Sequence, residues 1–186
     1  FVMLEDFRAD PVTHKLRTPS GKIEIFSERI AGFGYHDCPG HPIWMNPVEW
    51  LGSAKDSQLH LISNQPKNKL HSQLDHGRLS QSDRIGGYEP ALIHPAVAAA
   101  RGIRKDDVIR VFNSRGACLC VAVLSDDVRQ GVIQISTGAW LDIKDTKGLC
   151  QQGNPNVLCL DKGTSKLGQG PSAHSCLVEI ELLEKA

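Results

Sequence analysis

The chain has 186 residues, which is typical of one globular domain with an appendage and long enough to bury a core without disulfide staples. Its 21 Lys and Arg residues balance its 21 Asp and Glu residues, so the formal net charge is zero. That balance argues against a nucleic-acid or anionic-membrane partner held by bulk charge. No apolar run approaches the roughly 18 residues that a membrane span requires. Because the sequence opens on Phe1 without a targeting pattern, we expect a fragment of a longer parent chain.

Residues 1–57 differ from the rest of the chain in being rich in Pro, Gly, His and aromatic residues. Within this segment only Lys22–Phe26 alternates as a strand does, directly after the turn residues Pro19–Gly21. Such a segment has few means of burying its own aromatic side chains. We therefore predict a connector over residues 1–57 and a separate domain over residues 58–186.

The cysteines and histidines do not form a complete metal-binding pattern. His36, Cys38 and His41 resemble part of a zinc site, but no second CxxC or HxxxH motif completes four ligands. The sequence therefore favours a structural loop at these residues. The six cysteines are scattered and lie mostly in apolar runs, which is typical of buried, reduced thiols in a cytosolic protein.

The second part of the chain is predicted to be mainly β with short helices. Val108–Phe112 and Ala117–Leu124 are apolar runs joined by turn residues, so they predict a hairpin. Because Ala117–Leu124 contains no charge, we expect both of its faces to be buried, as in a closed barrel. A short helix is expected from His94 to Gly102, with Pro95 in its first turn. Further strands are expected at Leu59–Ile62, Val132–Ile135 and Ser175–Leu183.

Two polar stretches are candidates for ligand binding. Ser63–Gln73 follows the strand Leu59–Ile62, and ligands commonly bind at the carboxyl ends of strands. The alternative is a loop whose side chains cap their own backbone. Lys162–Pro171 is rich in Gly, which lets backbone amides approach a ligand, and its alternative is a flexible surface crossing. No Walker loop, dinucleotide-binding glycine motif or nucleophile elbow is present, so we expect no self-contained catalytic set.

Seven stretches spread over nearly the whole chain follow one another in an order typical of a single protein family. They are TPSGKIEIFSE from Thr18, GHPIW from Gly40, LISNQPKNKLHSQLDHG from Leu61, HPAVAAARGI from His94, DDVIRVFNSRGA from Asp106, GNPNVL from Gly153 and GTSKLGQGPSAHSCLVE from Gly163. Together they resemble the C-terminal part of molybdopterin oxidoreductases of the dimethyl sulfoxide reductase family. The similarity is greatest to the branch of biotin sulfoxide reductases and trimethylamine N-oxide reductases.

This resemblance implies a double-psi β-barrel of the aspartate-decarboxylase-like type. Such a domain binds molybdopterin guanine dinucleotide, mainly its pterin and phosphate parts, and closes over the metal centre. The implied cofactor-binding residues lie on four loops: Ser63, Asn64, Gln65, Leu70, His71, Ser72 and Gln73; Thr137 and Gly138; Asn154 and Asn156; Gln169 and Gly170.

The chemistry of these residues is compatible with that cofactor. Asn, Gln and Ser side chains donate and accept hydrogen bonds, as the edge of a pterin requires, and backbone amides at Gly-rich turns suit its phosphates. Supplementary cations could come from Lys67, Lys69, Arg78 and Lys166, although a solvated surface position is favoured for each. Cys159 stands where the family pattern has Thr, so one hydroxyl contact to the cofactor would be lost.

By the same resemblance, the parent protein is a molybdenum-dependent enzyme that moves an oxygen atom from an S- or N-oxide to reduced molybdenum. The family's metal-ligating residue lies in an earlier domain, so no catalytic residue and no metal ligand is expected in this fragment, which alone would be inactive. Its expected partners are the preceding domains of the parent chain and, for the parent, a separate electron donor. The cysteines favour the cytoplasm, while relatives of this kind also work in the periplasm.

Two other functions are compatible with a small β-barrel. One is a partner- or peptide-binding module without a cofactor, in which the aromatic-rich N-terminal segment makes the contact. The other is a small self-sufficient enzyme of the decarboxylase-like barrel type, which needs a self-processed Gly-Ser pair or another nucleophile.

Overall fold

The computed structural model describes residues 1–144, 148–172 and 174–185 of the chain. They form two compact units, which are described separately. One comprises Phe1–Met45 with Gly163–Gly170 and is called the extension unit; the other comprises Asn46–Lys162 with Pro171–Ala186 and is called the barrel unit. The division after residue 57 into a connector and a domain stays a prediction.

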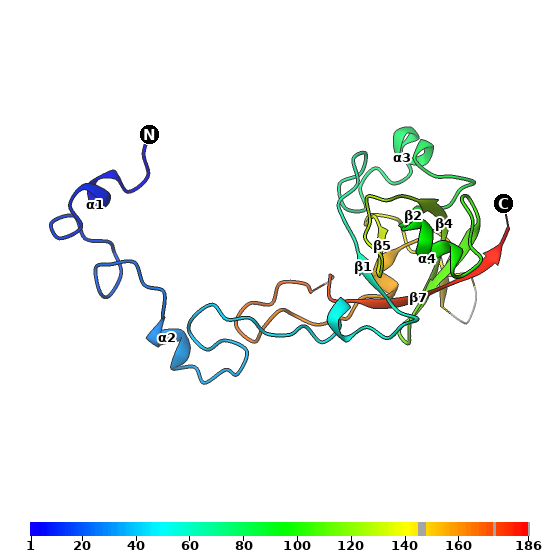
Figure 1. The fold of residues 1–186 in the computed structure, drawn as a ribbon. Coiled ribbons are helices and arrows are strands. Elements are labelled where there is room, and N and C mark those ends of the chain that lie inside the picture. Colours follow the sequence, from blue (N-terminus) through cyan, green and yellow to red (C-terminus); the bar gives the residue numbers. More distant parts are fainter. Residues whose placement is uncertain (145–147, 173, 186) are drawn as a thin grey trace. The chain divides into compact units, whose positions relative to one another are not determined.

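Six strands of the barrel unit close into a barrel (Figure 1). Around it the strands follow the order β2 (Pro90–Ile93), β5 (Val132–Ile135), β1 (Leu59–Ile62), β7 (Leu177–Glu184), β3 (Val108–Phe112) and β4 (Ala117–Leu124), and β4 pairs again with β2. The short strand β6 (Leu149–Cys150) is added to β4. The pairs β1–β5, β2–β4 and β4–β6 are parallel, and the others are antiparallel. The predicted fold class, a mainly β chain with a double-psi-like barrel and short helices, is confirmed.

The burial of the strands explains why this sequence closes into a barrel. Every residue from Ala117 to Ala122 of β4 is buried, which confirms that both faces of this uncharged strand are covered. On β1 the burial alternates, since Leu59 and Leu61 point into the core while Ile62 is 38% exposed. Two strands, β2 and β6, were not predicted, because both are short and lack a clear alternation.

The predicted helix after β2 is confirmed as α4 (Pro95–Ala99). His94 precedes it, and the Nδ1 atom of His94 accepts a hydrogen bond of 3.1 Å from the backbone N–H of Ala96. The polar stretch before β2 contains a short helix, α3 (Arg78–Ser82). Two short 3-10 turns also occur in the barrel unit, η1 (Leu51–Ser53) and η2 (Pro155–Val157). In the part of the chain that the structure describes, none of the helices has the length and apolar character that a bilayer crossing requires.

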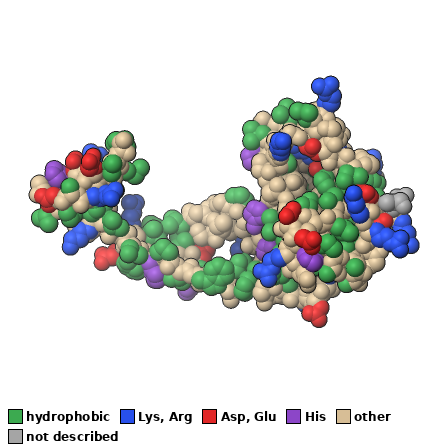
Figure 2. Space-filling view, turned by 45° about the horizontal axis from the view of Figure 1, so that its top comes forward, with side chains coloured by type: hydrophobic (Ala, Val, Ile, Leu, Met, Phe, Trp, Pro, Cys, Tyr) green, Lys and Arg blue, Asp and Glu red, His purple; other side chains and the backbone are tan. Residues whose placement is uncertain are grey.

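The extension unit contains two short helices, α1 (Glu5–Ala9) and α2 (Glu28–Ala31), joined by turns. The strand predicted at Lys22–Phe26 is wrong, because no strand of the described residues pairs with it. Its alternation also lacks a core to face, since Ile23 is 69% and Ile25 is 79% exposed. A strand needs a hydrogen-bonded neighbour, and alternation alone does not supply one. Apolar side chains accordingly lie on the surface of this unit (Figure 2).

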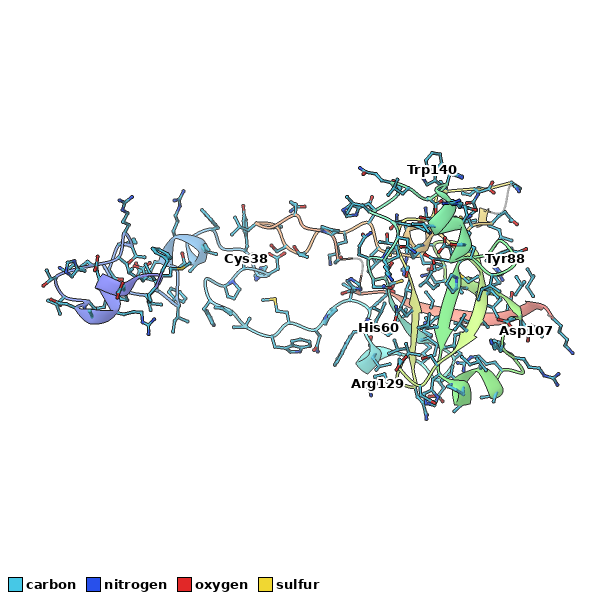
Figure 3. All side chains as sticks on the ribbon, turned by 90° about the horizontal axis from the view of Figure 1, so that it is seen from above. Cys38, His60, Tyr88, Asp107, Arg129 and Trp140 are labelled. Carbon is cyan, nitrogen blue, oxygen red and sulfur yellow. The ribbon has the colours of Figure 1, made fainter. Side chains whose placement is uncertain are left out.

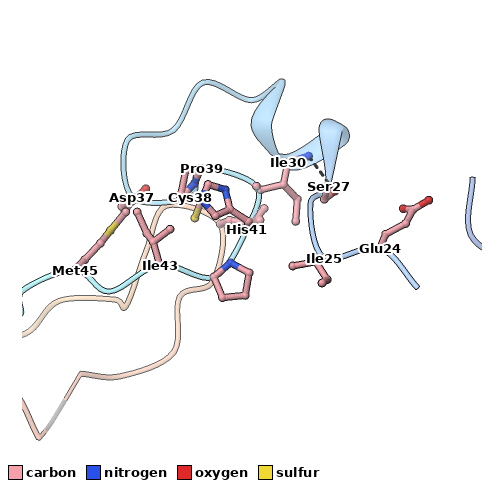
Figure 4. A pocket seen from close by; sticks show the side chains of 13 residues that line it. Glu24, Ile25, Ser27, Ile30, Asp37, Cys38, Pro39, His41, Ile43 and Met45 are labelled. Carbon is pink, nitrogen blue, oxygen red and sulfur yellow. Dashed lines mark hydrogen bonds between the residues drawn. The ribbon is translucent and has the colours of Figure 1, made fainter. Parts of the chain in front are cut away.

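The predicted loop around His36, Cys38 and His41 lies in the extension unit. Cys38 and His41 line a cavity of about 520 Å³, whose other walls include Ile25, Ile30 and Leu167 (Figure 4). The carboxylate of Asp37 accepts a hydrogen bond of 2.9 Å from the backbone N–H of Lys166. Among the described residues, no three His, Cys, Asp or Glu side chains gather as a metal site would require.

Glu49 ties residues 46–57 to the barrel. Its carboxylate accepts two hydrogen bonds from the guanidinium of Arg115, at 2.6 and 2.9 Å, and a third of 2.7 Å from the backbone N–H of Leu177. The hydrogen bond from Arg115 and, more weakly, the N–H of Leu177 outweigh the effect of burial and hold the pKa of Glu49 below its usual value. Glu49 is therefore expected to stabilise the fold in its charged form.

Replacing Glu49 by Gln should destabilise the chain by about 1–2 kcal/mol at pH 7, since a charged acceptor of three hydrogen bonds is lost. A lowered folded pKa means that this stabilisation is present above the unfolded pKa, about 4.3, and disappears as the pH falls through the folded pKa. The advantage of the wild type over the variant should therefore shrink as the pH falls below the unfolded pKa of about 4.3 and continue to shrink on further acidification. Urea denaturation at several pH values measures this, and a difference that does not shrink below about pH 4 would contradict it.

Candidate functional site

The carboxyl ends of β1 and β5 lie side by side because these two strands run parallel, with His60 opposite Val132 and Ile62 opposite Gln134. The loops that follow them, residues 63–77 and 136–141, therefore leave the barrel at the same edge. Residue Trp140 of the second loop lies at the end of the barrel unit opposite Arg129, which precedes β5 (Figure 3). The parallel topology thus brings together two polar loops that are about 70 residues apart in sequence.

A cavity of about 480 Å³ opens between these loops and η2. Its lining comes from three segments, called the first, second and third walls in chain order: His71 and Ser72; Thr137, Gly138, Ala139, Trp140 and Leu141; Asn154 and Asn156. No Lys, Arg, Asp or Glu side chain is among these lining residues. The cavity therefore offers hydroxyl, amide, imidazole and indole groups, together with backbone, in surroundings without a formal charge.

Three of the four predicted loops thus meet at one cavity of the barrel unit. The predicted residues that line it are His71, Ser72, Thr137, Gly138, Asn154 and Asn156. The fourth loop belongs to the extension unit, where the side chain of Gln169 donates a hydrogen bond of 2.6 Å to the carbonyl of Ser165. Gly170 closes the same turn, as its carbonyl accepts a hydrogen bond of 2.9 Å from the N–H of Thr164.

The predicted residues Asn64 and Gln65 brace the loops and do not line the cavity. The side-chain oxygen of Asn64 accepts hydrogen bonds from Gln134 (2.9 Å) and Ser136 (3.1 Å), and its carbonyl accepts one of 2.9 Å from the N–H of Thr137. Gln65 donates to the carbonyl of Lys69 at 2.5 Å and accepts from the N–H of His71 at 3.3 Å. Gln65 therefore caps the backbone of its own loop, as in the self-capping alternative, whereas the side-chain oxygen of Asn64 joins that loop to β5 and to the residue after it.

The remaining predicted residues of the first loop have other surroundings. The backbones of Leu70 and Gln73 exchange hydrogen bonds of 2.9 and 3.3 Å, which closes a tight turn with His71 at φ 52°. That turn directs His71 and Ser72 to the cavity while Leu70 is 56% exposed. The hydroxyl of Ser63 is buried and has no hydrogen-bond partner among the residues that the structure describes.

Gly138 is the point at which two of the three walls touch. Its φ is +102°, a conformation that side chains rarely adopt, and a Cβ atom there would lie 2.1 Å from the carbonyl oxygen of His71. A glycine at this position is therefore required both by the backbone conformation and by the close approach of the first loop.

Trp140 is a cavity residue that the sequence did not single out. Its indole N–H donates a hydrogen bond of 2.8 Å to the carbonyl of Ser72, and its ring packs edge-on against His76 with centroids 4.5 Å apart. The available signal was an aromatic residue directly after the run of small residues that follows β5. Ala139 and Leu141, which also line the cavity, carried no comparable signal.

The polar groups of the cavity are largely uncommitted. Within the described residues, the side chains of Ser72, Thr137 and Asn156 make no hydrogen bond to the protein. Asn154 is 8% exposed and uses its side-chain oxygen to accept a hydrogen bond of 2.9 Å from the N–H of Asn156. These donors and acceptors are therefore available to a ligand.

The four predicted supplementary cations differ in position. Lys67, Arg78 and Lys166 are exposed, whereas the side chain of Lys69 is 2% exposed and is ion-paired. The surface position favoured for Lys69 is therefore wrong, because two acidic side chains compensate its burial.

The closed barrel carries an uncharged cavity with hydrogen-bonding groups at one end of its sheet. A family model described as the Molydopterin dinucleotide binding domain matches residues 59–177, and the chain belongs to this family. The matched range contains the cavity and every strand of the barrel except most of β7.

Relatives in sequence agree with this assignment, and a solved structure shares the fold. The chain is 48% identical over 178 residues to a biotin sulfoxide reductase of Cereibacter sphaeroides, covering 96% of this chain and 24% of that protein. It is 50% identical over 188 residues to a trimethylamine-N-oxide reductase of Salmonella typhi, covering 97% of this chain and 22% of that protein. The chain thus spans about a quarter of the length of these curated relatives. Acetylene hydratase from Pelobacter acetylenicus shares the fold, with a TM-score of 0.74 at 20% identity over 94% of this chain and 25% of that one.

Proposed function

We propose that the chain acts as the cofactor-binding domain of a larger molybdenum-dependent S- or N-oxide reductase, and that the cavity holds part of molybdopterin guanine dinucleotide. The observation that carries this proposal is the meeting of three polar loops at one cavity with uncommitted hydrogen-bonding groups. Membership of the dinucleotide-binding family and two oxide reductases at 48% and 50% identity support it.

The lining residues suit the ring system of such a cofactor. Asn154, Asn156, Ser72 and Thr137 present both donors and acceptors, which an aminopyrimidine edge of the pterin or guanine type matches in both directions. Because the lining has no cationic side chain, the doubly charged pyrophosphate is better accommodated elsewhere, by backbone amides and by cations. The cavity therefore fits a heterocycle in preference to the phosphates.

The residues of this chain would bind and orient the cofactor and keep water from it. When bound, the cofactor supplies the oxygen-atom transfer, with electrons resupplied by a separate donor. Trp140 and Leu141 add apolar surface to one wall, and the bracing by Asn64 and Gln65 keeps the opposite loop in place. The chain itself contributes no catalytic residue and no metal ligand to this proposal.

The larger protein supplies the other partners. Its preceding domains would carry the metal ligand and the substrate funnel, and a separate protein or quinol would deliver electrons. We place the protein in the cytoplasm, because its six cysteines are free thiols and four of them are buried in the barrel, with the periplasm as the alternative.

Hydrogen exchange of the full-length parent, with and without its cofactor, tests the assignment. Cofactor binding should slow exchange of backbone amides in residues 63–73, 137–141 and 154–156, while amides of α4 (Pro95–Ala99) serve as the control and remain unchanged. Equal exchange of the cavity amides in loaded and unloaded enzyme would overturn the site. A parent that carries no molybdenum or guanine nucleotide, and whose extension unit captures a peptide, would favour the binding-module alternative.

A further inference from the structure

Four charged side chains are buried together behind the cavity and are called the ion quartet: Lys69, Asp75, Arg84 and Glu89. Their side chains are 2%, 0%, 6% and 4% exposed, respectively. The ammonium of Lys69 lies 2.9 Å from Asp75 and also contacts Glu89. The guanidinium of Arg84 donates to both carboxylate oxygens of Asp75, at 2.9 and 3.0 Å, and to Glu89 at 2.9 Å. Each cation therefore contacts both anions, and the formal charges cancel.

Stability alone does not explain the ion quartet. Burial of each ion costs several kcal/mol in desolvation, which the mutual attraction only roughly offsets. An apolar cluster of the same volume is commonly as stable or more so. Burial raises the pKa of Asp75, but the hydrogen bonds from Lys69 and from the backbone N–H of Trp140, together with the charges of Lys69 and Arg84, outweigh it. The pKa of Asp75 is therefore lowered, and this carboxylate is held in its charged form. Ion pairs instead fix the relative positions of the side chains, because each charged group bonds to a particular partner in a particular direction.

The ion quartet contacts the second wall of the cavity directly and adjoins the first and third walls along the chain, without lining the cavity. On the second wall, the carboxylate of Asp75 accepts a hydrogen bond of 3.1 Å from the backbone N–H of Trp140. Arg84 donates a hydrogen bond of 3.0 Å to the side chain of Gln152, which precedes the third wall. On the first wall, Lys69 lies two residues before His71, and its carbonyl is held by Gln65.

Two glycines show how closely the segments around the cavity pack against the ion quartet. A Cβ atom on Gly138 would lie 3.4 Å from the side chain of Lys69, and one on Gly153 would lie 2.7 Å from the Cβ of Glu89. Gly153 directly precedes Asn154, at φ +67°. Gly138 of the second wall and Gly153, next to the third wall, therefore lie close to two different members of the ion quartet.

From these contacts we propose that the ion quartet is the positioning device of the cofactor cavity, holding the three polar walls at the spacing that the bound heterocycle requires. The proposal rests on the proposed function for the identity of the ligand. Lys69, Asp75, Arg84 and Glu89 are positioning residues, since none of them lines the cavity. The ion quartet acts through Trp140, through the turn at His71 and through the Gln152–Gly153 segment.

The test uses the full-length parent and a charge-neutral change, Lys69→Met with Glu89→Gln. This double variant removes one cation and one anion and leaves the Arg84–Asp75 pair intact. Its thermal midpoint should stay close to that of the wild type, while the cofactor dissociates about 10-fold faster, as is typical when supporting partners of a site are lost. Dissociation is followed by release of molybdenum and of guanine nucleotide from the purified protein. In the unloaded protein, amides of residues 137–141 and 152–156 should exchange faster at unchanged global stability.

Arg84→Lys is the conservative variant, which keeps the charge and loses the planar fork, so its dissociation rate should lie between those of the wild type and the double variant. The matched control is Arg110→Gln with Glu181→Gln, an exposed ion pair of 2.7 Å between β3 and β7, which should change neither readout. Unchanged cofactor dissociation and unchanged amide exchange in both the double variant and Arg84→Lys would overturn the inference.

If the double variant does not fold, the dissociation rate and amide exchange of Arg84→Lys alone decide the test. A wild-type parent that contains no cofactor would refute the proposed function. A wild type that contains the cofactor, with variants that release it no faster and exchange their amides no faster, would refute only the role of the ion quartet.

Discussion

Replacing Gly138 by Ala should prevent the full-length parent from retaining its cofactor. The backbone at this position has φ +102°, and the added methyl group would lie 2.1 Å from the carbonyl oxygen of His71. The first and second walls of the cavity must therefore separate. Strain and overpacking of this kind cost about 3 kcal/mol, which corresponds to roughly a 100-fold loss of affinity if the bound state alone requires the close approach. Molybdenum and guanine nucleotide content per protein molecule measures the effect.

Gly102→Ala is the matched control for backbone strain. Gly102 also has a positive φ, +67°, but a Cβ atom there has no neighbour within 4 Å among the described atoms. This variant should lose about 1 kcal/mol of stability and keep its full cofactor content. Equal cofactor loss in both variants would show that strain alone causes it, and full loading of Gly138→Ala would refute the contact between the two walls as a requirement for binding.

The barrel could be predicted from the sequence because burial leaves a direct pattern. The uncharged run Ala117–Leu124 and its turn-linked neighbour Val108–Phe112 become β4 and β3 with the expected hairpin pairing. Lys22–Phe26 has an equally clear alternation and forms no strand, because a pattern of side chains does not show whether a partner strand exists. Periodicity therefore identified most strands of the barrel and failed in the extension unit, where the described residues form no sheet.

Its position after a strand made the loop Ser63–Gln73 a candidate, but the full set of cavity residues could be predicted only through the family resemblance. Ser72, Thr137 and Asn154 are far apart in sequence, and nothing in their local patterns shows that parallel pairing of β1 with β5 brings two of their loops together. The buried charges were also hidden, because Lys69 in a polar loop has the same local sequence character as a surface lysine. Long-range pairing and charge compensation are properties of the folded chain, so a single sequence does not display them.

Replacing Leu61 by Ala should cost the barrel about 2–5 kcal/mol of unfolding free energy, the range found for large-to-small changes in well-packed cores. Leu61 is 0% exposed, its partner across the parallel pair is the equally buried Ile133, and its N–H donates to the carbonyl of Cys176 at 2.9 Å. In a chain of this length each kcal/mol lowers the melting temperature by roughly 2–4 °C, so a fall of about 10 °C is expected. Denaturant and thermal unfolding of the chain measure both quantities.

The adjacent residue supplies the control, because Ile62 lies on the same strand and is 38% exposed. Ile62→Ala should cost about 1 kcal/mol or less, since part of its side chain remains in water in the folded state. The contrast between two neighbouring aliphatic residues isolates the inward face of β1 from its outward face.

Since the loop that contains His71 and Ser72 follows β1, the loss of stability in Leu61→Ala should also affect the cavity, as faster amide exchange in residues 63–73. Equal costs at the two positions would mean that β1 does not alternate between core and surface, and the barrel described above would then be wrong at this strand.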